Sequence, residues 1–397
     1  MSATRSAAEF AALRTRLKEF IDGEVIPAED LNAAHDMERN GAAIDRLRLR
    51  ARSLGFGPPR LSAAAGGLGL SWEECCGFFE EVGRSFLGPG ALDCAPPGQP
   101  DVAVLERLAN PMQRERYLGP LARGEVRSCF AMTEPAPGVG SDPRMLLATA
   151  RRDAGSRDAG SDAGWILNAH KWFISGATGA AFAIVVARTE AGVSWFLVDT
   201  DAPGFRIVRD IPTMEPFTRG GHAEIELVDC RVTADALVGE EGRGLEYAQM
   251  RLEGARLFHC MRYIGLASRA MQIAQDYAAK RESFGARLST HQMVQAMVAD
   301  AHIDLYASRL MTLDVARRLD SGKSIRHESS MAKVFVSEAV NRVADAAVQM
   351  TGALGISEDV PLSMILRQLR PFRIYDGASE VHRSAIAKRV FAKQLRA

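Results

Sequence analysis

Four long segments near the C-terminus have the apolar spacing of helices, and they constrain the fold more than any other feature. They span about residues 244–281, 289–320, 324–354 and 378–395. The second segment places one set of apolar residues on a single helical face: Met293, Val294, Met297, Val298, Ala301 and Leu305. Because such stripes pack against neighbouring helices, the pattern predicts a four-helix bundle with methionines filling its core.

Short segments rich in β-branched and aromatic residues precede these helices. In AEIELVD, Ile225 and Leu227 alternate with acidic residues, as in a strand with one solvated face. Turn formers such as DAPG separate the segments, so the pattern predicts a compact antiparallel β domain. The Asp-Ala-Gly repeat at residues 153–164 has the composition of a mobile surface loop, and we assign no function to it.

The N-terminal third again has helical spacing, because Phe10, Leu13 and Leu17 recur every three or four residues. Helices, then strands, then helices predict an α+β protein in three parts. The expected parts are an N-terminal helical domain (1–127), a middle β domain (128–240) and a C-terminal helical bundle (241–397).

Charge and cysteine content exclude several classes of protein. Lys plus Arg and Asp plus Glu both number 49, which argues against a nucleic-acid binder driven by phosphate attraction. No apolar run has the length of a membrane span, and the N-terminus lacks the apolar core of a secretory signal. We therefore expect a cytoplasmic protein, with the mitochondrial matrix as the alternative. The six cysteines are irregularly spaced and predict reduced thiols and no metal site.

The most specific stretch is CFAMTEPAPGVGSDP, from Cys129 to Pro143. Gly138 and Gly140 allow a backbone to approach a ligand closely, and threonine and serine hydroxyls can bind it. By itself, the stretch is equally consistent with an ordinary transition from a strand to a loop.

Five further motifs follow in order: HKWFISGA, LVGEEGRGLEYAQMRLEGAR, RESFGARLSTHQ, AVQMTGALGI and IYDGASEVHR. Together with the first stretch, they resemble the acyl-CoA dehydrogenase family in sequence, order and spacing over nearly the whole chain. The resemblance implies FAD as cofactor, an acyl-CoA substrate and an electron-transferring flavoprotein as electron acceptor. It also implies a homo-oligomer, with a tetramer as the commoner form and a dimer as the alternative.

The resemblance assigns a first set of residues to the flavin. These residues are Phe130, Met132, Thr133 and Ser141 beside the ring and the phosphates, with Phe173 and Ser175 on the next strand. Ser141 would also lie near the substrate. Trp172 is an alternative to Phe173 as the aromatic residue over the ring.

A second set would reach FAD from elsewhere. Arg281, Phe284, His291 and Gln292 match positions that contact the FAD of a neighbouring subunit, Gln349 and Gly352 match the segment at the adenine half, and Ser379 completes the set. From the residues alone, an arginine just past a helix is more often a C-terminal cap with a solvated charge. In the same way, His291 is equally a residue at the start of a helix.

The catalytic base is expected at Asp376, because Tyr375-Asp376-Gly377 matches a segment that is Tyr-Glu-Gly in many members. A branch with Asp-Gly before a Glu-Val-His run is similar to this chain. The Asp side chain is shorter than that of Glu by one C–C bond, about 1.5 Å. Another branch carries its base at the position of Ala255, which cannot ionise. The alternative for Asp376 is a helix N-cap.

The resemblance also assigns residues to the acyl-CoA. They are Ser141, Glu253, Arg256, Gly377 and Lys388, although a solvated helix face is an alternative for Lys388. Ala378 and Glu380 stand where the family often has Thr and Gln near the adenine.

The implied reaction is α,β-dehydrogenation of an acyl-CoA to the trans-2-enoyl-CoA. Two other functions remain open: a nitroalkane oxidase-like flavoprotein that uses an Asp base, and a catalytically silent flavoprotein.

Overall fold

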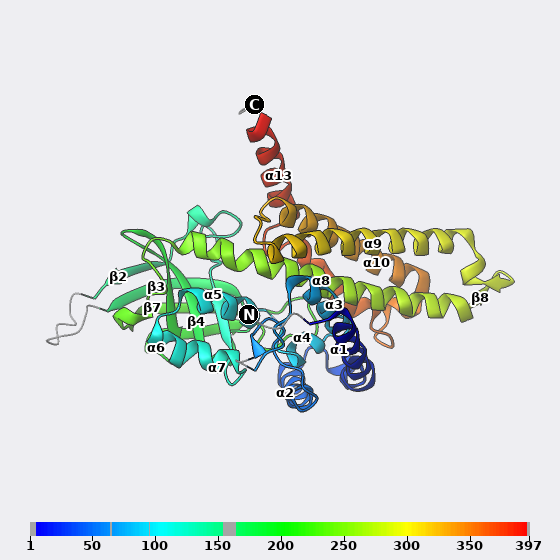
Figure 1. Cartoon of the computed structure of the whole chain (residues 1–397), viewed down its shortest axis with the longest axis horizontal. Helices are drawn as coiled ribbons and strands as arrows, with labels where there is room; N and C mark the ends of the chain where they lie inside the picture. The colour runs from blue at the N-terminus through cyan, green and yellow to red at the C-terminus, as the bar shows by residue number, and fades with distance from the viewer. Residues whose placement is uncertain (1–4, 64–65, 95, 154–163, 395–397) are drawn as a thin grey trace. The chain divides into compact units, whose positions relative to one another are not determined.

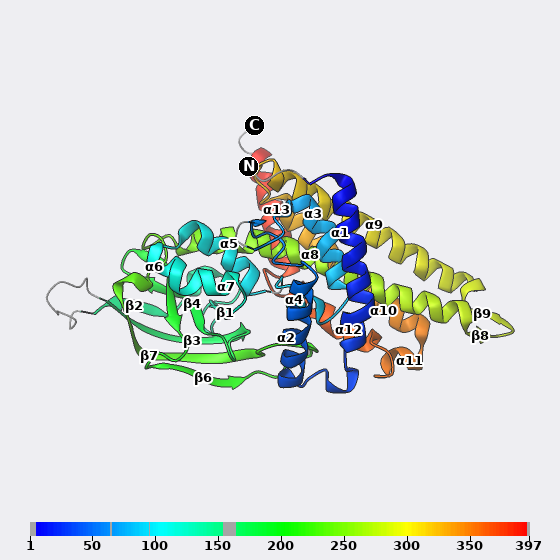
Figure 2. The same cartoon turned by 60° about the horizontal axis from the view of Figure 1, so that its bottom comes forward.

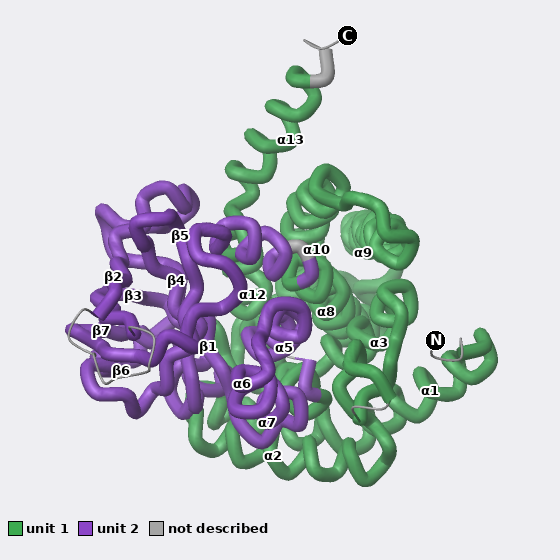
Figure 3. Tube along the Cα trace, turned by 60° about the vertical axis from the view of Figure 1, so that its left-hand side comes forward, with its two compact units in different colours: residues 1–92, 214–217, 255–397 green, residues 93–213, 218–254 purple. Residues whose placement is uncertain are grey.

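The computed structural model describes residues 5–63, 66–94, 96–153 and 164–394. The Asp-Ala-Gly loop predicted at residues 153–164 therefore lies almost wholly outside the described residues. The chain divides into two compact units (Figure 3). Unit 1 comprises residues 1–92, 214–217 and 255–397, and unit 2 comprises residues 93–213 and 218–254.

Unit 2 is built on a sheet that contains seven strands within the described residues. They are β1 (Ser128–Ala131), β2 (Thr149–Arg152), β3 (Trp165–Ser175), β4 (Phe182–Thr189), β5 (Gly192–Asp199), β6 (Phe205–Asp210) and β7 (His222–Val232). The order is β1-β4-β2-β3-β7-β6, and β5 also pairs with β4. Most pairs are antiparallel, as predicted, but β1 runs parallel to β4, so the sheet is mixed.

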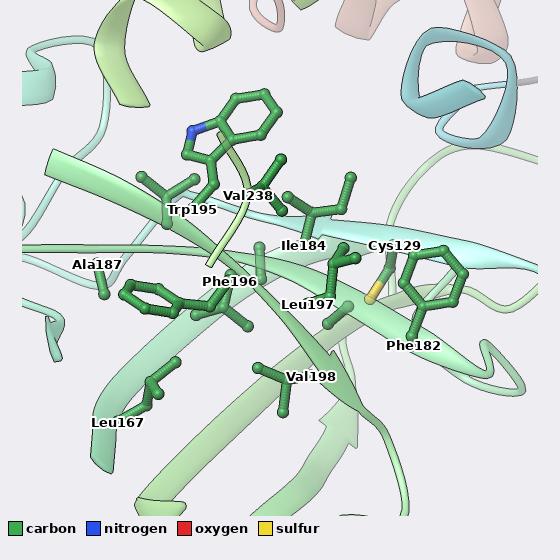
Figure 4. Close-up of a cluster of buried hydrophobic side chains, with 14 of the residues drawn as sticks. Cys129, Leu167, Phe182, Ile184, Ala187, Trp195, Phe196, Leu197, Val198 and Val238 are labelled. Carbon is green, nitrogen blue, oxygen red and sulfur yellow. The ribbon is translucent and has the colours of Figure 1, made fainter. Parts of the chain in front are cut away.

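The centre of this sheet is buried on both faces. Trp195 and Phe196 of β5 point to opposite sides of their strand and are both fully buried (Figure 4). The ring of Trp195 packs edge-to-face against the rings of Phe130 and Tyr247, whereas the ring of Phe196 packs edge-to-face against that of Trp165. Burial of large aromatic side chains on both faces makes the sheet a rigid base for the loops at its edges.

Short helices complete unit 2. They are α5 (Gly98–Leu108), α6 (Pro111–Gln113), a π-helical turn (Arg114–Leu118) and α7 (Gly119–Ala122). Asn110 and Gln113 form a capping box at the start of α6, so local polar residues fix where this helix begins.

Four helices of unit 1 come from the N-terminal part of the chain. They are α1 (Ala7–Phe20), α2 (Met37–Ser53), α3 (Trp72–Gly83) and α4 (Gly88–Ala91). Capping boxes start α1 at Ser6 and α3 at Ser71. At Gly83, an added Cβ would lie 2.0 Å from the carbonyl oxygen of Arg262, so this glycine lets α3 approach the later helix α8.

The remaining helices lie in the C-terminal part of the chain, and the last of them projects away from the others (Figures 1 and 2). They are α8 (Gly244–Lys280), α9 (Gln292–Asp320), α10 (Glu328–Thr351), α11 (Ala353–Ile356), α12 (Leu362–Leu369) and α13 (Ser379–Gln394). The first residues of α8 belong to unit 2. Between α8 and α9 lies the hairpin β8 (Glu282–Ser283) and β9 (Ala286–Arg287).

The bundle core confirms most of the predicted apolar stripe on α9. Ala301 and Leu305 are buried, and Val294, Met297 and Val298 pack partly buried against the same cluster. Met293 was wrongly placed in the core: it is 76% exposed, because it lies in the first turn of α9, beside the hairpin. Among the described residues, no helix is both long enough and apolar enough to cross a membrane.

Candidate active site

The Thr-Glu-Pro segment that follows β1 is built around the buried carboxylate of Glu134. The carboxylate accepts hydrogen bonds from the backbone N–H groups of Val139 (3.2 Å), Leu147 (2.7 Å) and Ala148 (2.8 Å). The N–H of Glu134 in turn donates to the carbonyl of Val139 at 2.8 Å. A Cβ at Gly138 would lie 2.6 Å from Glu134 Cβ and Oε2, so the turn requires glycine there. Glu134 therefore fixes the course of this loop.

Lys171 of β3 supplies the opposite charge. Its fully buried Nζ donates to Glu134 Oε1 (2.8 Å) and to the carbonyls of Met132 (3.0 Å) and Val186 (2.8 Å). Burial lowers the pKa of Lys171 to about 8, although Glu134 opposes the shift. Burial acts to raise the pKa of Glu134, but Lys171 and the amide donors outweigh it and hold that pKa below its usual value. The pair therefore ties the loop after β1 to β3.

Several residues predicted to contact the flavin lie close to one another, next to the Glu134–Lys171 ion pair. The Trp172 N–H donates to the carbonyl of Thr133 (3.1 Å), and the Thr133 hydroxyl donates to the carbonyl of Trp172 (2.7 Å). Phe173 has a φ of +52°, and 47% of its surface is exposed. Ser175 Oγ lies 2.9 Å from His222 Nδ1. The predicted residues of the loop and of β3 are thus neighbours, and they present an exposed aromatic ring.

Phe130 and Ser141 occupy different surroundings from each other. The ring of Phe130 packs under the guanidinium of Arg251, at 4.1 Å, while Ser141 is exposed. Arg251 Nε donates to Asp101 Oδ1 (2.6 Å), and Ser128 Oγ donates to Asp101 Oδ2 (2.7 Å). This second buried ion pair supports Phe130 and was not predicted from the sequence.

In unit 1, the loop around Asp376 follows a 3₁₀ turn, Arg370–Arg373, and precedes α13. Asp376 has a left-handed φ of +53°. Its carbonyl oxygen accepts hydrogen bonds from Arg256 Nε (2.9 Å) and His382 Nε2 (3.0 Å), and the carbonyl of Gly377 accepts one from Lys333 Nζ (2.7 Å). Donors from three helices, α8, α10 and α13, therefore hold the backbone of this loop.

The groups that hold the loop have shifted pKa values. Burial lowers the pKa of His382 to about 4, with Arg256 adding to the shift, so the ring is neutral near pH 7 and its Nε2–H is the donor. Burial also lowers the pKa of Lys333 to about 8 and raises the pKa of the neighbouring Cys260 to about 12. The thiol is therefore un-ionised, and Asp376 lies among cationic and neutral groups.

The interpretation of Asp376 as an N-cap is wrong. The carbonyl of Ala378 accepts the N–H of His382 (3.1 Å), and α13 begins at Ser379, so Ala378 is the N-cap residue. The Asp376 side chain is 16% exposed, and its Oδ2 lies 3.5 Å from His259 Nε2. The carboxylate is therefore mostly enclosed, next to an imidazole.

Tyr375, the residue before Asp376, joins a cluster of rings. Its hydroxyl donates to Tyr263 Oη at 2.6 Å, and its ring lies 4.9 Å from that of His259 and 5.7 Å from that of Phe372. Burial raises the pKa of Tyr375 well above its usual value, so the phenol stays protonated and can donate. The loop is thus anchored on both sides of the predicted base.

A group of predicted FAD residues gathers at the hairpin between α8 and α9. Phe284 is 96% exposed, with a φ of +52°, and its ring lies 6.5 Å from that of His291. His291 Nε2 is 3.2 Å from the carbonyl of Ser283, and His291 stands at the N-cap of α9. Arg281 and Gln292 are exposed at the two ends of this hairpin segment.

The other predicted residues lie apart from this group. Gln349 and Gly352 are exposed at the end of α10, where Gly352 has a φ of +66° and open space around it. Lys388 is exposed on α13, whereas Ser379 is only 1% exposed. The side chain of Glu253 lies outside the described residues.

Sequence reasoning missed Lys171 beside the Thr-Glu-Pro segment of unit 2. It also missed four residues around the Asp376 loop of unit 1: His259, Arg262, Lys333 and His382. For two of these residues, the sequence contains a feature from which they could have been found. Lys333 lies within the otherwise apolar run MAKVFV, and His259 lies three residues after Arg256, on the same side of a helix.

The sequence matches three descriptions of one family. Residues 7–125 match "Acyl-CoA dehydrogenase, N-terminal domain", residues 129–230 match its middle domain and residues 242–391 match its C-terminal domain. The probable acyl-CoA dehydrogenase FadE2 of Mycobacterium tuberculosis is 34% identical, over 96% of this chain and 95% of that protein. Acyl-CoA dehydrogenase family member 11 of Mus musculus is 35% identical over 96% of this chain, which spans 50% of that relative's length.

Solved structures agree with this match. The acyl-CoA dehydrogenase of Geobacillus kaustophilus superposes with a TM-score of 0.83 at 26% identity, over 98% of this chain and 100% of that chain. A structure described as PigA with FAD and proline has a TM-score of 0.84 at 23% identity, over 99% of this chain and 100% of that chain, and shows the fold alone. Together, these matches cover every part of the fold described above. The chain therefore belongs to the acyl-CoA dehydrogenase family.

Proposed function

We propose that this chain is an FAD-dependent acyl-CoA dehydrogenase in which Asp376 is the catalytic base. The family consists of oxidoreductases that act on CH–CH bonds and use FAD, and this chain is a member of it. The observation that carries the proposal is the loop of Asp376: a mostly enclosed carboxylate on a backbone held by Arg256, His382 and Lys333. A base that acts on a weakly acidic C–H bond needs such a fixed position.

The residues expected at the flavin fit the cofactor chemically. Phe173 offers an exposed ring for contact with an aromatic system, and exposed Ser141 offers a hydroxyl. Arg281 offers an exposed guanidinium for a phosphate, and Gly352 has the open space that a close backbone contact requires. When bound, FAD supplies the acceptor for the hydride.

In the proposed reaction, an oxygen of the Asp376 carboxylate takes the α-proton of the acyl thioester. The electron pair of that C–H bond would form the α,β double bond while the β-hydrogen departs with its own electron pair as a hydride. The backbone N–H of residue 376 would donate to the thioester carbonyl and stabilise the charge that develops there. The cations Arg256 and Lys333 hold the carbonyls of Asp376 and Gly377, so they fix the two peptide groups that follow the base.

The Tyr375 side of the loop supports the same role. Its hydrogen bond to Tyr263 fixes the residue before the base, and the surrounding rings keep water away from one side of the loop. Exclusion of water strengthens each electrostatic contact of the carboxylate.

The residues proposed to bind the substrate, the electron acceptor and the assembly follow from what is general in the family. Arg256, Gly377, Glu253, Lys388 and Ser141 would bind the acyl-CoA, and an electron-transferring flavoprotein would reoxidise the enzyme in fatty acid β-oxidation. A homotetramer is the proposed assembly, which is consistent with the exposed Phe284 and its neighbours on the hairpin. The proposed location is the cytoplasm, a compartment in which the six cysteines, none of them in a disulfide, would stay reduced.

The test is anaerobic reduction of the bound flavin by acyl-CoAs of graded length and branching. The purified protein should be yellow and should bleach with a suitable thioester. Asp376→Asn should keep the colour and reduce the flavin about 10²–10⁴-fold more slowly, as expected for loss of a general base. A normal bleaching rate in this variant would disprove the assignment of the base.

Two other outcomes would replace the proposal. Peroxide production from nitroethane, without bleaching by any acyl-CoA, would indicate a nitroalkane oxidase-like enzyme. A well-folded oligomer that neither retains nor binds FAD would indicate a catalytically silent protein.

A further inference from the structure

His259, a residue that the family resemblance did not point to, faces the carboxylate of Asp376. It lies on α8, its side chain is only 7% exposed, and its Nε2 is 3.5 Å from Asp376 Oδ2. The imidazole is packed among the rings of Tyr263, Phe372 and Tyr375, with centroid distances of 5.9, 5.7 and 4.9 Å. The ring is therefore confined with one nitrogen directed at the predicted base.

The other ring nitrogen reveals which tautomer is present. Arg262 Nε lies 3.1 Å from His259 Nδ1. A guanidinium is always protonated and can only donate, so Nδ1 must accept with its lone pair. The proton of neutral His259 is therefore on Nε2, the nitrogen that lies 3.5 Å from Asp376 Oδ2.

Arg262 also reaches the residue on the other side of the base. Its Nη2 donates to Tyr263 Oη at 2.8 Å, and the same oxygen accepts the Tyr375 hydroxyl at 2.6 Å. A single guanidinium is thus linked through His259 to Asp376 and through Tyr263 to Tyr375.

We propose that Arg262 and His259 are positioning residues that hold the Asp376 carboxylate in the orientation needed for proton abstraction. The inference rests on the proposed role of Asp376 as the base. The final torsion of an Asp side chain is broad, so the carboxylate needs an external contact to fix its rotation.

The distance of 3.5 Å is longer than a normal N–H···O hydrogen bond. Contacts of catalytic groups are often long in the free enzyme and shorten when substrate binds. The same contact offers a reason why a base shorter by about 1.5 Å than Glu can work here. The neighbouring residues would hold the short Asp side chain in one orientation, whereas a longer Glu side chain could reach the α-proton from several orientations.

The pair also predicts a pH behaviour. Protonation of Nδ1 would break its hydrogen bond with Arg262 and bring two cations together. The titratable and charged groups around this pair come from five parts of unit 1. They are Arg256, Cys260 and Tyr263 of α8, Lys333 of α10, Tyr375 and Asp376 of the loop, His382 of α13, and Glu215 of the segment 214–217. Arg262→Met removes the donor to Nδ1 and the second cation, so the flavin-reduction rate of this variant should depend on pH differently from that of the wild type.

The first experiment measures flavin reduction by stopped flow with an acyl-CoA that bleaches the wild-type enzyme. His259→Phe keeps a ring in the aromatic pocket and removes the N–H. It should lower the reduction rate about 10²-fold, with little change in KM and an unchanged flavin spectrum. His259→Gln retains an N–H donor and should recover the rate to within about tenfold of wild type. A wild-type rate in His259→Phe would overturn the proposal.

A double-mutant comparison separates positioning from general support of the fold. In an Asp376→Glu background, His259→Phe should cost less than about tenfold, because a longer carboxylate depends less on being aimed. An equal cost in both backgrounds would show that His259 acts only on stability. If His259→Phe fails to fold, His259→Gln and the pH profile of Arg262→Met carry the test, and a profile unchanged from wild type would overturn it.

The outcomes also distinguish this proposal from the one on which it rests. If Asp376→Asn reduces the flavin normally, Asp376 is not the base and the proposed function fails. If Asp376→Asn is slow while His259→Phe is normal, only the positioning role fails.

Discussion

Lys171→Met tests how strongly unit 2 depends on its buried ion pair. Methionine keeps an unbranched side chain in a fully buried site and removes the Nζ that donates to Glu134 and to two carbonyls. Removal of one partner of a buried pair costs about 3–5 kcal/mol. Because Glu134 keeps its three backbone amide donors, we expect the lower end of this range, about 3 kcal/mol.

The assay is thermal unfolding of the purified protein at pH 7, followed by circular dichroism. A loss of about 3 kcal/mol should lower the midpoint of unit 2 by about 6–12 °C, since domains of this size shift by about 2–4 °C per kcal/mol. The matched control is Arg206→Met, which breaks the exposed pair with Glu226 and should cost no more than about 1 kcal/mol. Adding Glu134→Gln to Lys171→Met should restore part of the midpoint, because no buried charge then lacks its partner.

Two results would refute this reasoning. One is a midpoint for Lys171→Met within about 2 °C of the Arg206→Met control, which would mean that the buried carboxylate needs no counter-charge. The other is a double variant that loses the full sum of the two single losses, which would mean that the two side chains do not interact.

The remaining predictions concern the loop of Asp376. Burial lowers the pKa of His382 to about 4 in the folded protein, whereas the unfolded chain binds the proton near pH 6.5. The free energy of unfolding should therefore fall as the pH drops from about 6.5 to about 4. His382→Gln should make this fall smaller, which thermal midpoints measured at a series of pH values would show. Lys333→Met removes the donor to the Gly377 carbonyl and should slow flavin reduction by about 10-fold to 10²-fold while the bound flavin keeps its spectrum; an unchanged rate would contradict the holding role. Gly377→Ala should be worse than Lys333→Met in the same assay, because a Cβ would lie 2.7 Å from His382 Nε2 at a φ of +96°.

Much of the fold could be predicted because periodicity and turn residues are local signals. The long helices α8, α9, α10 and α13 lie close to the predicted segments, and strands β1 to β7 lie within the predicted middle part, whereas the short hairpin β8–β9 was not predicted. The helix α12, Leu362–Leu369, was missed because its eight residues are too few to show a clear period between turn-forming neighbours. The parallel pairing of β1 with β4 was missed because pairing partners depend on contacts far apart in sequence.

In the candidate site, too, residues in local motifs could be predicted, whereas residues that act through long-range contacts could not. The segment around Asp376 and the Thr-Glu-Pro stretch were found because each is a short contiguous motif. Lys171 is separated by 37 residues from the carboxylate that it neutralises, and Lys333 by 44 residues from the carbonyl that it holds. No local pattern encodes these contacts, since only the packing of distant elements creates them. Met293 shows the converse: its spacing is that of a core residue, but its helix extends beyond the bundle core.

The left-handed backbone of Asp376, with its φ of +53°, limits which amino acids can occupy this position. Asn and Asp adopt that conformation more readily than other residues with a side chain, while longer or branched side chains strain it. Among the folded variants of a library randomised at codon 376, Asp, Asn and Gly should therefore be enriched, Glu should be less frequent, and only the two carboxylates should support turnover. The backbone conformation at this turn therefore restricts which residue can stand at position 376, independently of the reaction. Of the two acidic residues, Asp adopts this conformation with less strain than Glu.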